Sequence, residues 1–278
     1  MSKLIELFGL PAHSPANWAE VAGQQHCPYL KRTCLKVRKS QPHISIGTCT
    51  VEYGGSPVII CPHRLLERRQ VFSDALHLLT RHEPGNELHL ISEIEVPGGS
   101  IDYLLVSARD RKVADFVGVE LQTLDTTGTV WPERQRFLAK HGVKVRNADT
   151  SSQKSFGMNW KMTAKTILVQ MHHKVETFQH LGKHLVLVIQ SPLLAYMRAN
   201  FKFDHLRKPT VSDPMHIHAY DMTQSESGFK LRLTDRFSTD VEGVVRCLGL
   251  QADSNIELGI IVKSIEAKLT DETLFQLA

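Results

Sequence analysis

The chain lacks the marks of a secreted or membrane protein. Its opening string, MSKLIELFGLP, has no basic segment followed by a long apolar run and a small-residue cleavage site. Apolar runs elsewhere are short, and one of the longest, Leu185 to Ile189, is far too short to span a bilayer. These absences predict a soluble, cytoplasmic protein without a membrane partner.

Repeats, low-complexity tracts and a strong excess of one charge are absent as well. The 278 residues are enough for one large domain or two small ones with a real apolar core. A net charge of +4 is only mildly basic. Such a balance permits nucleic-acid binding without establishing it, because many basic proteins bind no nucleic acid.

Cysteines are few, and four of the five lie in the first quarter of the chain, at Cys27, Cys34, Cys49 and Cys61. An odd number gathered toward one end of an intracellular chain is poor evidence for disulfides. The spacing, with 6, 14 and 11 residues between successive cysteines, contains no tight Cys-x2-Cys pair. Cys49 nevertheless follows a Gly47-Thr48 turn and Cys61 precedes Pro62, and both positions suit turns that hold ligands.

Four thiolates favour zinc or iron in a tetrahedral, structural site. The sequence alone does not separate the two metals. Four buried, reduced thiols are the plainer alternative, and one ligand could instead be a neighbouring histidine, His26, His43 or His63. The fifth cysteine, Cys247, falls in an expected helix from Val241 to Leu248, where it fits the role of a small buried apolar residue.

Basic residues surround the four cysteines: Lys31, Arg32, Lys36, Arg38, Lys39, Arg64, Arg68 and Arg69. A rigid, metal-tied loop that carries arginine and lysine suits the backbone phosphates and guanine edges of DNA, although the same residues also make an ordinary solvated surface. Residues 1–72 are therefore predicted to form a loop-rich, metal-binding, DNA-contacting segment. Its short strands, Ile44 to Tyr53 and Pro57 to Cys61, need a metal or a neighbouring core.

Residues 73–278 are predicted to form a second domain that begins with three strands. These run from Glu87 to Val96, from Ile101 to Ser107 and from Val113 to Leu124. The turns Pro97-Gly98-Gly99 and Asp110-Arg111-Lys112 separate them, so we expect consecutive antiparallel neighbours.

Helical and strand patterns then follow one another. Helices are expected from the Ser73 cap through Leu78 to Arg81, over Trp131 to His141, over Trp160 to Phe178, after Ser191-Pro192 and over Asn255 to Lys268. Strands are expected over Leu185 to Ile189, Met215 to Met222 and Phe229 to Leu233. Strands flanked by helices on both sides predict an α/β domain with a mixed central sheet.

Three polar residues fall on the expected strands near one edge. Asp102 follows the Gly98-Gly99 turn, while Glu120 and Gln122 lie two apart on a later strand and so share one face. A hairpin can bring Asp102 beside Glu120, and two converging carboxylates form an oxygen-rich site suited to Mg²⁺, which can polarise a phosphodiester and activate water. Such patterns also occur in unrelated proteins, but charged residues that interrupt a buried strand are costly unless they bind something.

The order of Asp102, Glu120 and Gln122 resembles the PD-(D/E)XK nuclease pattern. Glutamine stands where lysine is usual, and Ser100-Ile101 stands before the aspartate where a proline is usual. The string VELQTLDTTG, from Val119 to Gly128, is similar to the NotI-type restriction endonucleases when it is taken together with the four cysteines. The stretch from Asn159 to Gln170 resembles the same family more weakly.

The resemblance implies a restriction-endonuclease-like fold and a Mg²⁺-dependent type II restriction endonuclease that cuts double-stranded DNA at a short specific site. It implies iron at the four cysteines. It also implies a two-fold homodimer, because a palindromic site presents two equivalent scissile phosphates. In that family a further glutamate upstream of the aspartate joins the site; Glu93 and Glu95 both fit, and Glu95 is preferred because it lies closer to the turn.

Gln122 leaves catalysis open, because an amide can hydrogen-bond water but supplies no charge. Either the metal carries more of the catalysis, or a lysine elsewhere substitutes, or the site is inactive. Lys161 and Lys165, on one helix face away from the apolar stripe, are candidate substitutes or phosphate contacts, and equally plain surface residues. Two other functions stay open: a metal-stabilised DNA-binding protein without catalysis (a degenerate nuclease), and a structure-specific repair nuclease.

Overall fold

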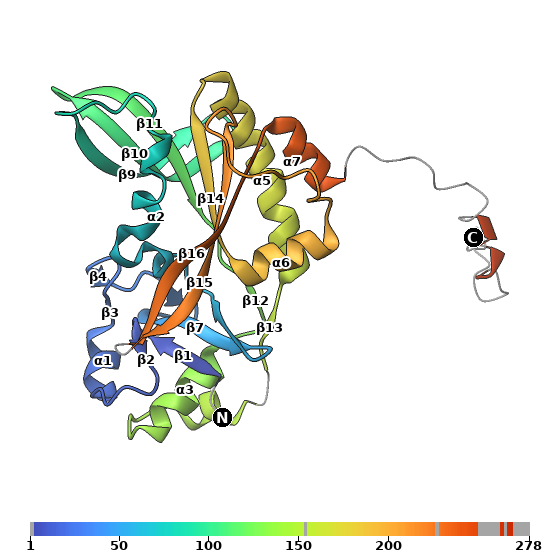
Figure 1. The fold of residues 1–278 in the computed structure, drawn as a ribbon. Coiled ribbons are helices and arrows are strands. Elements are labelled where there is room, and N and C mark those ends of the chain that lie inside the picture. Colours follow the sequence, from blue (N-terminus) through green and yellow to red (C-terminus); the bar gives the residue numbers. More distant parts are fainter. Residues whose placement is uncertain (1–2, 153–154, 226–227, 250–261, 264–265, 269–278) are drawn as a thin grey trace, which may run out of the picture.

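Two β-sheets organise the computed structural model, which describes residues 3–152, 155–225, 228–249, 262–263 and 266–268. The larger sheet has six strands in the order β16-β15-β14-β11-β10-β9, and the smaller has four in the order β2-β1-β7-β8. Figure 1 shows the larger sheet mainly in the upper part of the molecule, with the smaller sheet and the other N-terminal elements below it.

The larger sheet is mixed. Its strands are β9 (Glu87–Val96), β10 (Gly99–Arg109), β11 (Lys112–Leu121), β14 (His184–Gln190), β15 (Met215–Ser225) and β16 (Gly228–Thr239). β9, β10 and β11 are consecutive antiparallel neighbours, as predicted, whereas β11, β14 and β15 pair in parallel. The predicted α/β fold with a mixed central sheet is confirmed.

β14 lies at the centre of the sheet, and all of its residues are buried. Successive side chains in a strand point to opposite faces, so β14 contributes side chains to two separate apolar cores, one on each face of the sheet. Leu185, Leu187 and Ile189 pack into the core that includes α5 (Trp160–His180), α6 (Ser191–Asn200) and α7 (Val241–Leu248). Val186 and Val188 pack into the core of the opposite face. Figure 1 shows α5, α6 and α7 together on one side of the sheet and α2 on the other.

The apolar stripe predicted from Trp160 to Phe178 forms the buried face of α5. Its members Ala164, Ile167, Leu168, Met171, Val175 and Phe178 are each at most 2% exposed. Gly118 of β11 lets this helix come close, because a Cβ there would lie only 2.6 Å from the Phe178 ring. α5 therefore packs tightly against the strand that carries Glu120.

The N-terminal part of the chain builds the smaller sheet and several short elements. Its strands are β1 (Leu4–Leu7), β2 (Leu10–Pro11), β7 (Thr48–Tyr53) and β8 (Ser56–Ile59). Two-residue to five-residue strands pair beside it: β3 (His26–Cys27) with β4 (Arg32–Thr33), β5 (Val37–Arg38) with β6 (Gln41–Ser45), and β12 (Thr126–Thr127) with β13 (Gly157–Met158). The N-terminal part also contains α1 (Trp18–Gln24), whereas α3 (Trp131–Lys140) and α4 (Asn147–Ser151), like β12 and β13, come from the middle of the chain.

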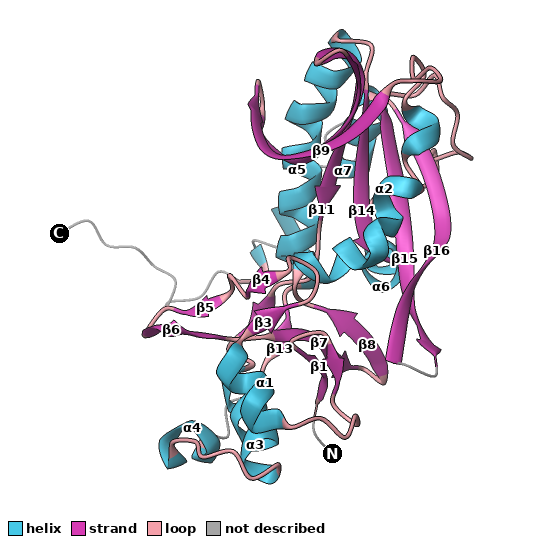
Figure 2. Cartoon of the chain, turned by 90° about the vertical axis from the view of Figure 1, so that its left-hand side faces the viewer, coloured by secondary structure: helices cyan, strands magenta, loops and turns pink. Residues whose placement is uncertain are grey.

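The N-terminal segment has an apolar core that it shares with α3. Leu7 and Trp18 pack with Phe137 and Leu138 of that helix, and the Trp18 and Phe137 rings meet edge to face at 4.8 Å between centroids. Figure 2 shows α1, α3 and α4 gathered at the same end of the molecule. The helix α3, which lies beyond residue 72, thus completes this core. The domain boundary predicted between residues 72 and 73 stays a prediction.

Two local predictions are wrong. Ile44 to Tyr53 is not one strand, because Gly47, at φ +67° with the Phe8 ring packed against its Cα, turns the chain between β6 and β7. Ser73 does not cap a helix. It is the last residue of α2 (Gln70–Ser73) and donates its hydroxyl to the Arg69 carbonyl at 3.5 Å.

Short 3₁₀ turns take the place of the helix expected up to Arg81. The segment contains η1 (Pro62–Arg69) before α2 and η2 (Leu76–Leu78) after it. Its buried apolar residues, Leu65, Val71, Phe72, Ala75, Leu78 and Leu79, belong to the core of the opposite sheet face. Packing these closely spaced apolar side chains onto the sheet overrides local helix propensity.

The predicted C-terminal helix, Asn255 to Lys268, lies mostly outside the described residues. Within the ranges that the structure describes, no helix combines the length and apolar character needed to cross a membrane.

Candidate active site

Asp102 and Glu120 lie side by side on neighbouring strands. Because Tyr103 of β10 pairs with Val119 of β11, Asp102 lies across from Glu120. The Asp102 Oδ2 accepts a hydrogen bond from the backbone N–H of Leu121 at 2.8 Å, which holds its carboxylate against the end of β11. The structure therefore brings together the two carboxylates on which the sequence argument depends.

Both carboxyl groups are harder to ionise than free ones. Burial raises the pKa of Glu120, and the neighbouring Asp102 carboxylate raises it further, to about 7 despite an ion pair with Lys174. Burial also raises the pKa of Asp102, although the Leu121 N–H and Lys174 oppose the shift. Two acidic groups that share a site in this way gain from a cation that neutralises both.

Glu93, not Glu95, lies nearest to this pair. Ile101 pairs with Ile94 and Tyr103 with Ser92, so the register places Glu93 across from Asp102, while Glu95 pairs with Ser100 at the turn. Glu93 has a left-handed backbone, φ +57°, in the middle of β9, and its charge helps to raise the pKa of Asp102. The expectation that Glu95 would be closer to Asp102 is wrong, because proximity to the turn does not decide which residue lies opposite.

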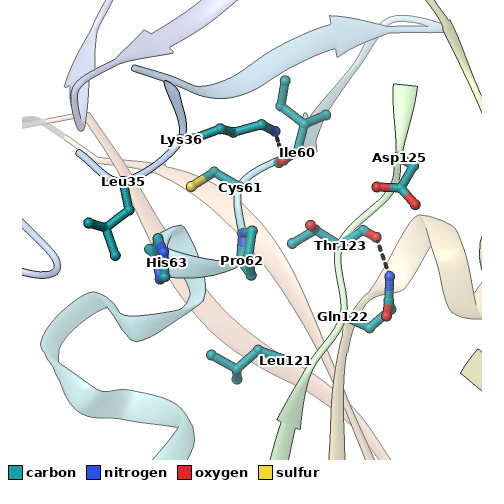
Figure 3. Close-up of a pocket in the computed structure, with 10 residues that line it drawn as sticks. All are labelled: Leu35, Lys36, Ile60, Cys61, Pro62, His63, Leu121, Gln122, Thr123 and Asp125. Carbon is teal, nitrogen blue, oxygen red and sulfur yellow. Dashed lines mark hydrogen bonds between the residues drawn. The ribbon is translucent and has the colours of Figure 1, made fainter. Parts of the chain in front are cut away.

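Gln122 follows the end of β11. Its backbone N–H donates to the Val188 carbonyl at 2.9 Å and extends the pairing with β14. Its side-chain Nε2 donates to the carbonyl of the adjacent Thr123 at 2.7 Å (Figure 3). The Gln122 amide is therefore held by its own segment, and it brings no charge to the site.

A lysine that the sequence analysis did not single out lies beside the carboxylates. The Lys174 Nζ, on α5, is 2.7 Å from Glu120 Oε1, and the two side chains are 9% and 7% exposed. The signal was present in the sequence, because Lys174 falls between Met171 and Phe178 on the apolar stripe of the helix. Lys161 and Lys165 are exposed, and in the described residues no ion pair joins them to Asp102 or Glu120.

A cavity of about 400 Å³ lies between the cysteine-bearing segment and the end of β11 (Figure 3). It is lined by Leu35, Lys36, Ile60, Cys61, Pro62, His63, Leu121, Gln122, Thr123 and Asp125. Burial and Arg32 lower the pKa of His63 while Asp102 opposes them, so the imidazole lies within electrostatic range of that carboxylate. The segment that carries the cysteines thus borders the carboxylate pair.

The four N-terminal cysteines are reduced and buried. The Cys49 thiol donates a hydrogen bond to the Gly47 carbonyl oxygen at 3.5 Å and lies beside the Cys61 sulfur, and Cys34 lies within electrostatic range of Cys61 and Cys27. The neighbouring Cys49 thiol, with Lys36 and the N–H groups of His63 and Arg64, lowers the pKa of Cys61 to about 6 against the effect of burial. In the described ranges, however, no three potential ligands already stand at metal-binding spacing, so the predicted four-cysteine site stays a prediction.

Two cations accompany these thiols. Arg134 is only 3% exposed and donates to the carbonyls of Ile46 and Ser45 at 2.7 and 3.3 Å, and among the described residues no carboxylate pairs with it. Burial lowers the pKa of Arg134 to about 10, and Cys34 opposes that shift. Lys36 acts on Cys61 and donates to the Ile60 carbonyl at 2.9 Å. Burial raises the pKa of Cys34, and the pKa of Cys49 is raised as well, so Cys61 is the thiol whose pKa these surroundings lower.

Comparison with known families gives one match. The model of the restriction endonuclease NotI matches residues 22–232 of this chain. The chain belongs to the NotI restriction endonuclease family. Membership makes it a type II restriction endonuclease, a hydrolase that acts on double-stranded DNA. The search of curated proteins found no match.

The NotI-family match spans both features described above. It includes Glu93, Asp102, Glu120, Gln122 and Lys174, and it includes the four N-terminal cysteines. The carboxylates, Lys174 and the buried thiols therefore all lie within the part of the chain that identifies the family.

The basic residues expected to meet the DNA differ in exposure in this NotI-family chain. Lys31, Arg32, Lys39, Arg68 and Arg69 are exposed, and Lys36 and Arg38 are half-buried, Lys36 donating to the Ile60 carbonyl and Arg38 pairing with Asp149 at 3.2 Å. Arg64, by contrast, is fully buried, with Nε 2.8 Å from Glu6 and Nη1 3.1 Å from Glu67. The expectation that Arg64 is free for DNA is wrong, because its guanidinium neutralises two carboxylates inside the protein.

Proposed function

We propose that this endonuclease binds Mg²⁺ through Asp102 and Glu120 and hydrolyses phosphodiester bonds at a short specific site in duplex DNA. The observation that carries the proposal is the pair of carboxylates across from each other on β10 and β11, each with a raised pKa. Their order along the chain resembles the PD-(D/E)XK pattern. Glu93, across from Asp102, is the third carboxylate of the proposed site.

The donor set fits magnesium, because carboxylate oxygens are the protein ligands that this ion prefers. When bound, Mg²⁺ supplies positive charge at the phosphate and lowers the pKa of water. Asp102 and Glu120 would hold the ion, and the Leu121 N–H fixes the orientation of Asp102. Hydrolysis forms a bond from the water oxygen to phosphorus and breaks the bond from phosphorus to a sugar oxygen, which ends protonated.

The four cysteines are proposed to hold one structural zinc or iron ion, with iron favoured by the family resemblance. The four buried thiols, the lowered pKa of Cys61, and the neighbouring cations Lys36 and Arg134 support a site where a metal ion would bind thiolates. The metal would tie together short loops that carry exposed basic residues. Those residues, Lys31, Arg32, Lys39, Arg68 and Arg69, are proposed to contact DNA phosphates and base edges.

Two copies of the chain are proposed to act together as a homodimer. A palindromic DNA site presents two scissile phosphates related by a two-fold axis, and a two-fold dimer places one site at each phosphate. Analytical ultracentrifugation of the protein with a short duplex that contains its site tests this directly. A two-to-one complex is expected, and a one-to-one complex contradicts the dimer.

Incubation with plasmid DNA tests the proposed activity. Discrete fragments should form with Mg²⁺ and disappear with EDTA, because the carboxylates alone supply no positive charge at the phosphate. The second candidate, a DNA-binding protein without catalysis, is favoured by the neutral, internally bonded Gln122 amide. That candidate predicts DNA that is shifted on a gel but uncut under both conditions.

A further inference from the structure

Lys174 occupies an unusual position for a charged residue. It lies on the buried stripe of α5, next to Val175 and between Met171 and Phe178, which are 0%, 0% and 1% exposed. An ammonium group taken out of water costs several kcal/mol unless it is paired. The residue therefore depends on the carboxylate that it meets at the sheet.

That carboxylate belongs to the proposed metal site. The Lys174 Nζ is 2.7 Å from Glu120 Oε1, and the ammonium also acts on Asp102, because it opposes the upward shift of the pKa of that residue. In the part of the chain that the structure describes, no other lysine or arginine forms an ion pair with Asp102 or Glu120. Lys174 is thus the cation nearest to both carboxylates.

The turn between β9 and β10 fixes the helix at this point. A Cβ on Gly98, which has φ +95°, would lie 2.9 Å from the His173 carbonyl oxygen, so only glycine allows this approach. A Cβ on Gly99 would lie 3.6 Å from Lys174 Cε, and the Thr177 hydroxyl donates to the Pro97 carbonyl at 2.8 Å. The same turn joins the strands that carry Glu93 and Asp102. Its contacts with α5 therefore fix the position of Lys174 relative to both carboxylates.

We infer that Lys174 is the active-site lysine of this enzyme. It comes from the helix α5, whereas the strand position at which a lysine is usual is occupied by Gln122. This inference rests on the proposed function. In this role the group stays an ammonium and exchanges no proton: it donates hydrogen bonds to the attacking water and to the phosphate oxygens, and it stabilises the negative charge that grows there. Gln122 cannot do this, because its amide is neutral and bonded to Thr123.

Three variants test the inference: Lys174→Met, Gln122→Lys and the double variant that combines them. Lys174→Met keeps the length of the side chain and should slow cleavage at saturating Mg²⁺ by about 100-fold or more, the usual loss for one charge-stabilising donor. The double variant should recover most of the lost rate, because it returns an ammonium to the site from the strand. Lys208→Met removes an exposed lysine and should cut as fast as the wild type.

Two measurements without cleavage separate this role from a structural one. DNA binding in Ca²⁺ should stay within about threefold of wild type for Lys174→Met, because phosphate contacts elsewhere supply most of the affinity. Titration calorimetry should show Ca²⁺ binding to Lys174→Met at least as tight as to wild type, because Glu120 is released from its ion pair. Weaker Ca²⁺ binding would assign Lys174 to holding the metal site together and overturn the inference.

The outcomes distinguish this inference from the proposed function. A wild-type enzyme that does not cut overturns both. A wild-type enzyme that cuts, with a Lys174→Met variant within threefold of its rate, overturns only the role of Lys174. If Lys174→Met fails to fold, the double variant decides: a folded double variant that cuts supports the role, while one that does not cut or does not fold overturns it.

Discussion

At the scale of single residues, the proposed site depends on two acids whose pKa values are both raised. Asp102 and Glu120 face each other across β10 and β11, and Lys174 offsets only part of their mutual repulsion. Replacing either acid with alanine should lower the cleavage rate by about three orders of magnitude, because the metal-derived stabilisation of several kcal/mol is lost. Gel-shift assays in Ca²⁺ should still show DNA binding, since phosphate contacts elsewhere supply most of the affinity. Near-normal cutting by Asp102→Ala would remove the site assignment.

The pKa of Glu120 also sets a pH dependence. This carboxyl must lose its proton to hold a metal, and its pKa is about 7, so Mg²⁺ and protons compete for it below that pH. The cleavage rate at limiting Mg²⁺ should therefore rise from pH 6 to pH 8, and raising Mg²⁺ should shift the midpoint to lower pH. Rates measured at two Mg²⁺ concentrations across this range test the effect. A profile that is flat at limiting Mg²⁺ would show that Glu120 does not ligate the ion.

At the scale of elements, the sequence predicted those parts whose pattern is local. Glycine and polar turns separate the segments that form β9, β10 and β11, and α5 repeats its apolar residues with helical spacing. The helix after Ser73 could not be predicted, because packing of the apolar segment onto the sheet decided its conformation. Strand register likewise decided that Glu93 and not Glu95 lies across from Asp102. Lys174 was visible as a break in an apolar stripe, but only the fold shows which acid it meets.

The cysteine-bearing loops give a prediction at the same scale. Elemental analysis of pure protein should find about one equivalent of iron or zinc, and Cys49→Ser should lower the free energy of unfolding by several kcal/mol, as expected for a structural metal. DNA binding should fail together with stability, because these loops carry the exposed basic residues. Ser14→Ala, in a loop outside the cysteines, is a control that should keep its metal. A metal-free wild type, or a fully stable Cys49→Ser variant with normal DNA affinity, would show that the four cysteines are only buried thiols.

At the scale of the whole molecule, a buried pair of histidines ties stability to pH. His216 and His218 of β15 are at most 1% exposed, and burial lowers their pKa to about 4 and about 3. Basic groups beside them, His184, His77 and Arg236, lower these pKa values further. The unfolded chain binds protons at these positions below about pH 6.5 while the folded chain does not, so stability present above that pH is lost as the pH falls toward 4.

Urea unfolding at pH 7 and pH 5 measures this linkage. Each histidine that stays neutral in the fold should cost up to about 1.4 kcal/mol per pH unit below 6.5. His218→Leu should reduce the difference between the two pH values, because it removes one of the two groups. Equal stability of the wild type at pH 7 and pH 5 would contradict this account of the buried pair.

The central claim is that Asp102 and Glu120 make a metal-dependent site that cuts duplex DNA at one specific sequence. The most direct test is to sequence the fragment ends of genomic DNA after incubation with Mg²⁺ and either the wild type or Glu120→Gln, which keeps the shape of the side chain and removes its charge. The account predicts that nearly all wild-type ends share one short palindromic sequence and that Glu120→Gln yields no ends above background. Ends at random positions, or the same specific ends from Glu120→Gln, would contradict it.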